Sequence, residues 1–205
     1  MSSETNPNSR LEAFCDGVFA FALTLLVVDI KIPSTPEIKT NADFWLALYT
    51  IIPSVFSFVL SFVIILITWV NHHGALKLIT KSAPSFIYAN GFLLLTVVFM
   101  PFPTSLLGEH LFTEHAAPAV ILYDAVQALQ ALGWVFVITA ALKNNLGKND
   151  TAIKVGRQNR QFAYFAFVLY SLCAVVAIWF PVTVALFTAL TWILWLVIGI
   201  NMKHE

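Results

Sequence analysis

The chain has 205 residues, of which 59% are hydrophobic and 11% are charged, and its formal net charge is zero. A soluble domain carries about 25% charged residues, so this composition excludes an ordinary soluble protein and indicates an integral membrane protein. The balanced charge gives no basis for expecting a nucleic-acid partner.

Six apolar segments are long enough to cross a bilayer, because a transmembrane helix needs about 20 mainly apolar residues. The predicted spans are approximately residues 11–32, 44–71, 85–107, 117–142, 161–180 and 182–202. Between the fourth and fifth spans, residues 143–161 are expected to contain a short helix at the membrane surface. The sequence therefore predicts an all-α polytopic membrane protein in which residues 1–205 form a single six-helix domain.

The first predicted span has two different faces when its residues are placed at about 100° per residue on a helix. One face holds Phe14, Gly17, Phe21, Thr24, Leu25 and Val28, and the roughly opposite face holds Asp16, Phe19, Leu23, Leu26 and Ile30. Small residues lie along the edge between them, at Ala13, Gly17, Ala20 and Thr24. This edge favours close approach of a neighbouring helix, as in ordinary helix packing.

Asp16 lies well inside the first span, where an ionised carboxylate near the centre of the bilayer costs about 2.5–3.5 kcal/mol and therefore needs a partner. The polar residues predicted at a similar depth on the second and third spans are Trp69, Asn71, His72, His73 and Asn90. We expect a hydrogen-bonded cluster that holds these helices together. A proton relay through Asp16 and the histidines is the alternative. A metal site is disfavoured, because adjacent residues on a helix point about 100° apart.

The fourth span carries Asp124, Gln127 and Gln130, and the two glutamines share one face. They are expected to pack between helices, with a polar cavity as the alternative. Cys15 and Cys173 lie in apolar runs without metal-ligand spacing and are interpreted as packing residues. The sequence contains no nucleophilic triad, phosphate loop or HExxH motif, so we do not expect an enzyme.

The distribution of basic residues predicts the orientation, since Lys and Arg in short loops favour the cytoplasmic side. With six spans, nine basic residues fall on the side of the two termini and two fall on the other side. The nine are Arg10, Lys77, Lys81, Lys143, Lys148, Lys154, Arg157, Arg160 and Lys203, and the two are Lys31 and Lys39. We therefore expect both termini in the cytoplasm.

The first span also carries the pattern R-x-x-x-F-x-D-G-V-F-A-x-A-x-T-L-L-V-x-D-I, from Arg10 to Ile30. Together with "WVNHHG" at the end of the second span and "NGFLLLTVVFMPFPTSLL" from Asn90 to Leu107, it resembles the prokaryotic, single-repeat branch of the lysosomal potassium channel family, transmembrane protein 175. The resemblance implies a homotetrameric cation channel of the cell membrane. Its first helices would surround one axial pore, without a TVGYG filter.

The resemblance also implies roles for individual residues. The narrowest ring would be at Phe21, a hydroxyl layer associated with K⁺ preference at Thr24, and a further apolar ring at Val28 with Leu25 nearby. Asp29 would lie at the pore mouth. The polar network around the pore helix would include Arg10, Asp16, Asn90 and one of His72 and His73. Two departures from the family pattern are Cys15, in place of serine, and Phe21, in place of isoleucine or leucine.

These observations predict a passive K⁺ channel with a hydrophobic gate and a modest preference for K⁺ over Na⁺, because hydroxyl oxygens select more weakly than stacked carbonyls. No cofactor is expected besides the permeant K⁺, and the expected surroundings are three further copies of the chain and the lipid bilayer. The alternatives are a secondary transporter or proton-coupled carrier that uses Asp16 and His72 or His73, and a non-conducting membrane scaffold.

Overall fold

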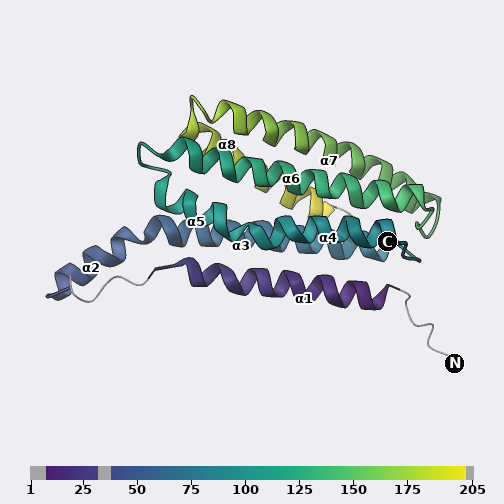
Figure 1. Ribbon diagram of the computed structural model, residues 1–205, viewed down its shortest axis with the longest axis horizontal. Helices are drawn as coiled ribbons and strands as arrows, with labels where there is room; N and C mark the ends of the chain where they lie inside the picture. The colour runs from purple at the N-terminus through teal and green to yellow at the C-terminus, as the bar shows by residue number, and fades with distance from the viewer. Residues whose placement is uncertain (1–7, 32–37, 202–205) are drawn as a thin grey trace.

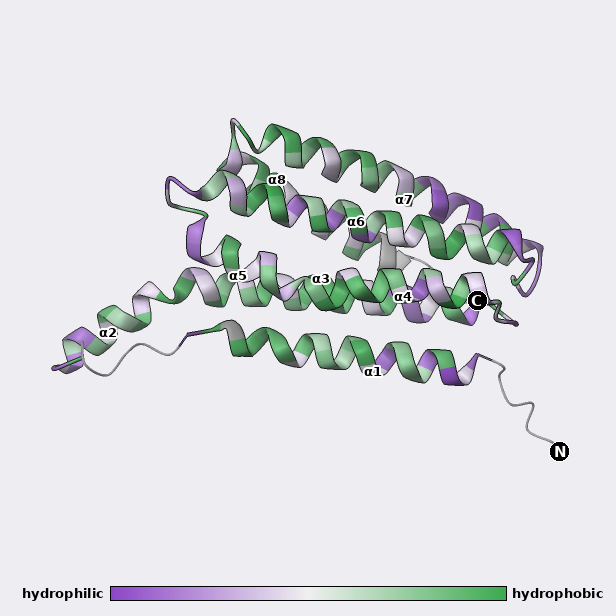
Figure 2. Cartoon of the chain, in the orientation of Figure 1, coloured by the Kyte–Doolittle hydropathy of each residue, from purple (hydrophilic) through white to green (hydrophobic). Residues whose placement is uncertain are grey.

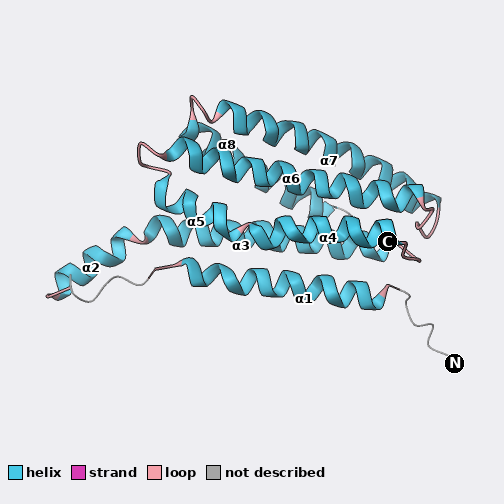
Figure 3. Ribbon diagram, viewed as in Figure 1, coloured by secondary structure: helices cyan, strands magenta, loops and turns pink. Residues whose placement is uncertain are grey.

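The computed structural model describes residues 8–31 and 38–201, apart from the side chains of Asp29 and residues 198–201, and every regular element in this part of the chain is a helix (Figure 3). In chain order these are α1 (Ser9–Leu25), the 3-10 turn η1 (Leu26–Asp29), α2 (Asn41–Thr50), α3 (Ile52–Lys77), α4 (Pro84–Phe99), α5 (Pro101–His110), α6 (Ala116–Lys143), α7 (Asp150–Val176) and α8 (Pro181–Asn201). The prediction of an all-α protein is confirmed.

The long helices run side by side, with α1 along one edge of the bundle (Figure 1). α1 packs on α3 and α4, whereas α6 lies further inside and contacts α4, α5, α7 and α8. The main core is formed where α1, α3, α4 and α6 meet, and it includes Phe19, Ile64, Leu94 and Val120. Because α1 has neighbours on one side only, its other face is uncovered in the single chain.

Five helical stretches in the described residues are long and apolar enough to cross a membrane. They are Ser9–Val28, Ile52–Lys77, Pro84–His110, Ala116–Lys143 and Asp150–Val176. The sixth predicted span corresponds to α8, which is a 21-residue apolar helix whose side chains are described as far as Val197. The count of six membrane crossings therefore stays a prediction.

The second predicted span, 44–71, differs from the structure at both ends, because α2 is a separate helix and α3 extends from Ile52 to Lys77. Thr40 and Asp43 start α2 with reciprocal hydrogen bonds, in which each side chain accepts from the other residue's backbone N–H at 3.2 and 2.8 Å. Pro53 then lies in the first turn of α3, where its missing N–H and fixed φ favour a new helix start.

Two further boundaries differ from the prediction. The short surface helix expected within 143–161 is absent as a separate element, because α7 begins at Asp150 and continues without a break to Val176. Asn149 caps this helix by accepting a hydrogen bond from the backbone N–H of Ala152 at 2.8 Å. The third predicted span is two helices, α4 and α5, and α5 begins at Pro101, which has no N–H to continue α4.

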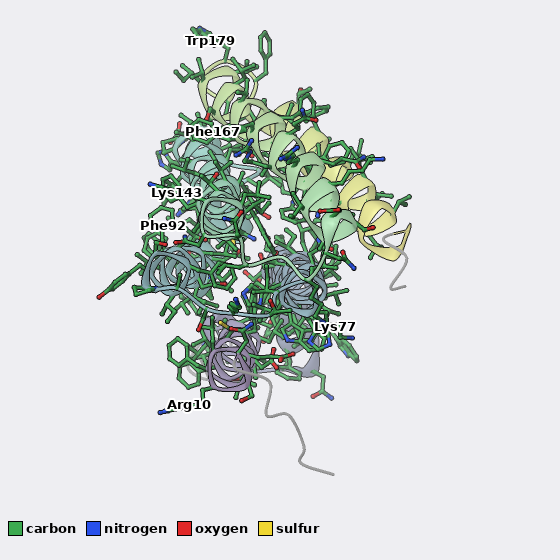
Figure 4. All side chains as sticks on the ribbon, turned by 90° about the vertical axis from the view of Figure 1, so that its right-hand side faces the viewer. Arg10, Lys77, Phe92, Lys143, Phe167 and Trp179 are labelled. Atoms are coloured by element: carbon green, nitrogen blue, oxygen red, sulfur yellow. The ribbon has the colours of Figure 1, made fainter. Side chains whose placement is uncertain are left out.

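Most charged residues lie near the ends of the bundle, and the middle is mainly hydrophobic apart from a few polar turns, as on α6 (Figure 2). One end holds Arg10 at the start of α1, Lys77 at the end of α3 and Lys143 at the end of α6. We call this the basic end, and Figure 4 views the bundle from it, with these three residues labelled. At the opposite end, Lys31 forms a solvent-exposed ion pair with Glu109, which links the chain after α1 to α5.

Candidate functional site

The uncovered face of α1 carries the residues that the sequence grouped together. In the single chain Phe14 is 62% exposed, Phe21 61% and Val28 73%, and Leu25, Gly17 and Thr24 are also exposed. On the other side of the helix, Phe19, Ala22 and Leu26 are buried in the core. The predicted division of this helix into two faces is therefore confirmed, and we call the exposed side the open face of α1.

Thr24 places a hydroxyl group among the apolar side chains of the open face. Its Oγ1 donates to the backbone carbonyl of Phe21 at 2.8 Å. Since a hydroxyl has one proton and two acceptor lone pairs, this bond uses the proton and leaves Oγ1 as an exposed acceptor. The open face therefore presents an oxygen that can contact a cation, between apolar residues on both sides.

The packed side of α1 carries a polar cluster that joins it to α3. Trp69 Nε1 donates to Asp16 Oδ1 at 2.8 Å, and His73 Nδ1 lies 3.2 Å from Glu12 Oε1. The rings of Trp69 and His73 stack with centroids 5.9 Å apart. Asp16 thus has an indole partner, whereas the sequence offered several polar residues without deciding among them. Glu12 was missed, although it lies one turn before Asp16 and so shares its face.

His72 makes a separate pair, which joins α3 to α4. It is 1% exposed, and its Nε2 lies 2.8 Å from Asn90 Oδ1. Asn90 Nδ2 donates to the carbonyl of Phe86 at 2.7 Å, so its Oδ1 is left to accept and His72 Nε2 is the donor. The His72 ring also lies 5.4 Å from that of Phe19 on α1. The two histidines therefore point to different partners.

The other predicted site residues lie elsewhere. Arg10 is exposed at the basic end, and the described part of the chain provides no hydrogen bond or ion pair to it, so it does not join the cluster within one chain. The Asp29 side chain lies outside the described part of the structure.

Three side chains of the cluster have the chemistry of metal ligands. Glu12, Asp16 and His73 each offer one ligand atom, and these atoms lie within 4.8 Å of one another. A set of two carboxylates and one imidazole suits a divalent cation in principle. Asp16 already has a partner in Trp69, whereas His73 Nδ1 lies 3.2 Å from Glu12 Oε1 without a hydrogen bond in the described structure.

The polar residues of α6 mainly connect helices. Thr188 donates to Asp124 Oδ1 at 2.8 Å across to α8, and Gln130 Nε2 donates to Thr68 Oγ1 at 2.8 Å across to α3. Gln127 and Gln130 also border a cavity of about 140 Å³ between α3, α6, α7 and α8. The packing interpretation and the cavity interpretation of these glutamines therefore both apply.

The sequence is similar to those of known proteins. Residues 10–101 match the family described as "Endosomal/lysosomal potassium channel TMEM175". A potassium channel of Chamaesiphon minutus is 42% identical over 123 residues, which cover 60% of either chain. A potassium channel of Streptomyces collinus is 37% identical over 143 residues, which cover 67% of this chain and 68% of that one.

A solved structure extends the likeness to nearly the whole chain. The crystal structure of a lysosomal potassium-selective channel TMEM175 homolog from Chamaesiphon minutus superposes with a TM-score of 0.76 at 32% sequence identity. The superposition covers 93% of this chain and 98% of that chain, so the likeness includes the helices beyond residue 101.

Proposed function

The chain belongs to the TMEM175 potassium channel family, and we propose that it conducts K⁺ passively through a pore lined by the open face of α1. The family is one of ion channels and not of enzymes, in agreement with the sequence prediction. The observation that carries the proposal is the uncovered stripe on α1, in which Thr24 lies between Phe21 and Val28 while the other side of the helix is buried.

We propose that the conducting unit is a homotetramer. In the single chain α1 lies at the edge of the bundle, so one copy can supply only one wall of a pore built on this face (Figure 1). Gly17 supports close contact between copies, since a Cβ added there would meet nothing within 4 Å inside the chain. Four copies around one axis would place the four open faces toward each other, as the resemblance implies.

The open face would act as gate and selector in separate layers. Rings of Phe21, and of Val28 with Leu25, would exclude water from a narrow passage and so block ions when closed. Between them, four Thr24 hydroxyl oxygens would replace part of the hydration shell of K⁺ and give a modest preference over Na⁺. Asp29 would attract cations at the mouth of the pore.

The charge distribution supports an orientation for this channel. Lys and Arg are concentrated at the basic end, and basic residues in short loops favour the cytoplasmic side. We propose that the basic end and both termini face the cytoplasm, that six helices cross the bilayer, and that the membrane is a prokaryotic plasma membrane.

A proton relay between Asp16 and His72 has less support, whereas His73 lies in the same cluster as Asp16 and stays the alternative route for a proton-coupled carrier. Asp16 accepts from Trp69, and His72 is paired with Asn90, so Asp16 and His72 are held by different partners. The test is the ion flux of purified protein reconstituted in liposomes. A channel passes K⁺ down its own concentration gradient, whatever the pH gradient, once an ionophore lets a compensating charge cross the liposome membrane. K⁺ movement that requires an imposed proton gradient would contradict the channel and support the carrier.

A further inference from the structure

A second cavity, of about 510 Å³, lies at the basic end between α3, α4, α6 and α7. We call it the basic-end cavity. Much of its wall is hydrocarbon, from residues that include Leu76, Phe86, Val137 and Leu142. Its volume falls in the range of about 300–1,000 Å³ that is typical of small-molecule sites. It is far larger than a packing defect and lies on the opposite side of α3 and α4 from the open face of α1.

Three cationic side chains also line the basic-end cavity. They are Lys143 at the end of α6 and Arg157 and Arg160 on α7. In the described residues none of the three is in an ion pair, and the lining contains no carboxylate. Guanidinium groups bind phosphate oxygens with two parallel hydrogen bonds, so this charge composition favours a phosphate-bearing anion.

Two lining residues have buried polar atoms without a hydrogen-bond partner in the described structure, namely His72 Nδ1 and Thr139 Oγ1. Because His72 Nε2 donates to Asn90, neutral His72 keeps Nδ1 as an acceptor. Buried polar groups are nearly always satisfied, by protein, water or ligand. A hydroxyl on a bound molecule could donate to His72 Nδ1, and Thr139 Oγ1 could bond to either a donor or an acceptor.

We propose that the basic-end cavity binds the phosphate group of an anionic phospholipid. The cations would hold the phosphate, and the apolar wall would contact the hydrocarbon next to it. Basic pockets between transmembrane helices on the cytoplasmic side are suited to such headgroups. Free inorganic phosphate shares the charged part of this chemistry, but it would leave the apolar wall without a partner.

The test is a calorimetric titration of the purified full-length protein in detergent with phosphatidylglycerol, phosphatidylcholine and inorganic phosphate. The variant R157Q/R160Q removes two cavity charges, and K148Q/K154Q is the matched control, because both lysines are exposed in the same region but do not line the cavity. Each basic residue near an anionic headgroup contributes about fivefold in affinity, so we expect about 30-fold weaker phosphatidylglycerol binding in R157Q/R160Q. The affinity of K148Q/K154Q for phosphatidylglycerol should fall by less than about threefold, because salt screens charges that are distant from the headgroup.

The proposal is overturned if both double variants lose affinity equally, or if neither phosphatidylglycerol nor phosphate binds more tightly than phosphatidylcholine. If inorganic phosphate binds with this dependence on the variants while phosphatidylglycerol binds no more tightly than phosphatidylcholine, the site takes free phosphate and the phospholipid proposal is overturned. Thr139→Val is a second variant that keeps the side-chain volume, and we expect phosphatidylglycerol to bind about fivefold more weakly to it. The titration measures no K⁺ flux, so its outcome is independent of the proposed channel function.

Discussion

The hydrogen bond between Trp69 and Asp16 offers a quantitative test of the anchoring role of Asp16. The bond is 2.8 Å long and joins a neutral donor on α3 to a carboxylate on α1, and both side chains are partly buried. Hydrogen bonds to charged groups contribute about 1.5–3 kcal/mol, and the partial exposure places this one near the lower end. We expect a coupling free energy of about 1.5 kcal/mol between the two side chains, or about tenfold in the unfolding equilibrium.

The double-mutant cycle consists of Asp16→Ala, Trp69→Phe and the combined variant. Trp69→Phe removes the donor but keeps an aromatic ring beside His73, so the stacking contact is largely retained. Asp16→Asn keeps an acceptor oxygen and is expected to lose less stability than Asp16→Ala. Trp179→Phe is a matched control, because Trp179 is 66% exposed, and we expect it to change stability by less than about 0.5 kcal/mol.

The assay is unfolding of the protein in mixed micelles by titration with sodium dodecyl sulfate, followed by circular dichroism. Additive effects of the two single changes, with a coupling below about 0.5 kcal/mol, would show that the bond does not anchor α1. Normal stability of Asp16→Asn together with complete loss of K⁺ flux would also contradict the anchoring role, because the carboxylate charge would then be needed for transport itself.

Other consequences of the structure can be tested separately. Phe21→Ala should raise the resting K⁺ leak in liposomes and Thr24→Val should lower the K⁺-to-Na⁺ permeability ratio; unchanged flux in both would remove these residues from the ion path. Hydrogen bonds from the side chain of the N-cap residue Thr40 and from the backbone N–H groups of Thr40 and Lys39 lower the pKa of Asp43, so its contribution to α2 is present above the unfolded pKa of about 4 and is lost as pH falls through the folded pKa. Protection factors of the α2 amides, which are corrected for the intrinsic pH dependence of exchange, should therefore fall in acid, and Asp43→Asn should abolish that fall. Gly108→Ala should lower the free energy of unfolding by about 1–3 kcal/mol in the titration with sodium dodecyl sulfate, since the new Cβ would lie 3.0–3.2 Å from atoms of α3. Gly17→Ala should leave the stability of the single chain unchanged in the same titration, because a Cβ there meets nothing within 4 Å.

Periodicity predicted the orientation of α1 well, for a physical reason. Its two faces differ strongly, because one packs Phe19 and Leu26 into the core and the other carries Phe21 and Val28 outward. The divergence of His72 and His73 follows from the same geometry, since consecutive helical residues point about 100° apart. For these residues, helical spacing alone was sufficient to predict which side of the helix each side chain faces.

Partners and helix boundaries were harder to predict. The indole of Trp69 is the partner of Asp16. The sequence placed several polar residues at a similar depth in the membrane, but it did not show which of them faces α1. The division between α2 and α3 depends on the cap at Thr40 and on Pro53. Both helices belong to one continuous apolar run, so hydropathy alone does not separate them. The basic-end cavity was not predicted, because Arg157 and Lys143 are brought together only by the packing of α6 on α7.

The most direct test of the central claim is chemical modification of the open face during transport. Native Cys15 and Cys173 are 0% and 7% exposed, so a cysteine introduced at Thr24 should react selectively with a cationic methanethiosulfonate reagent. Leu172→Cys on α7 is the control, because Leu172 is 57% exposed on a helix that is not proposed to line the pore. If the open face of α1 lines the pore, the reagent should lower K⁺ flux through Thr24→Cys at least tenfold (about 1.4 kcal/mol) and leave Leu172→Cys unchanged. Flux through modified Thr24→Cys that equals flux through the untreated variant would contradict the pore assignment.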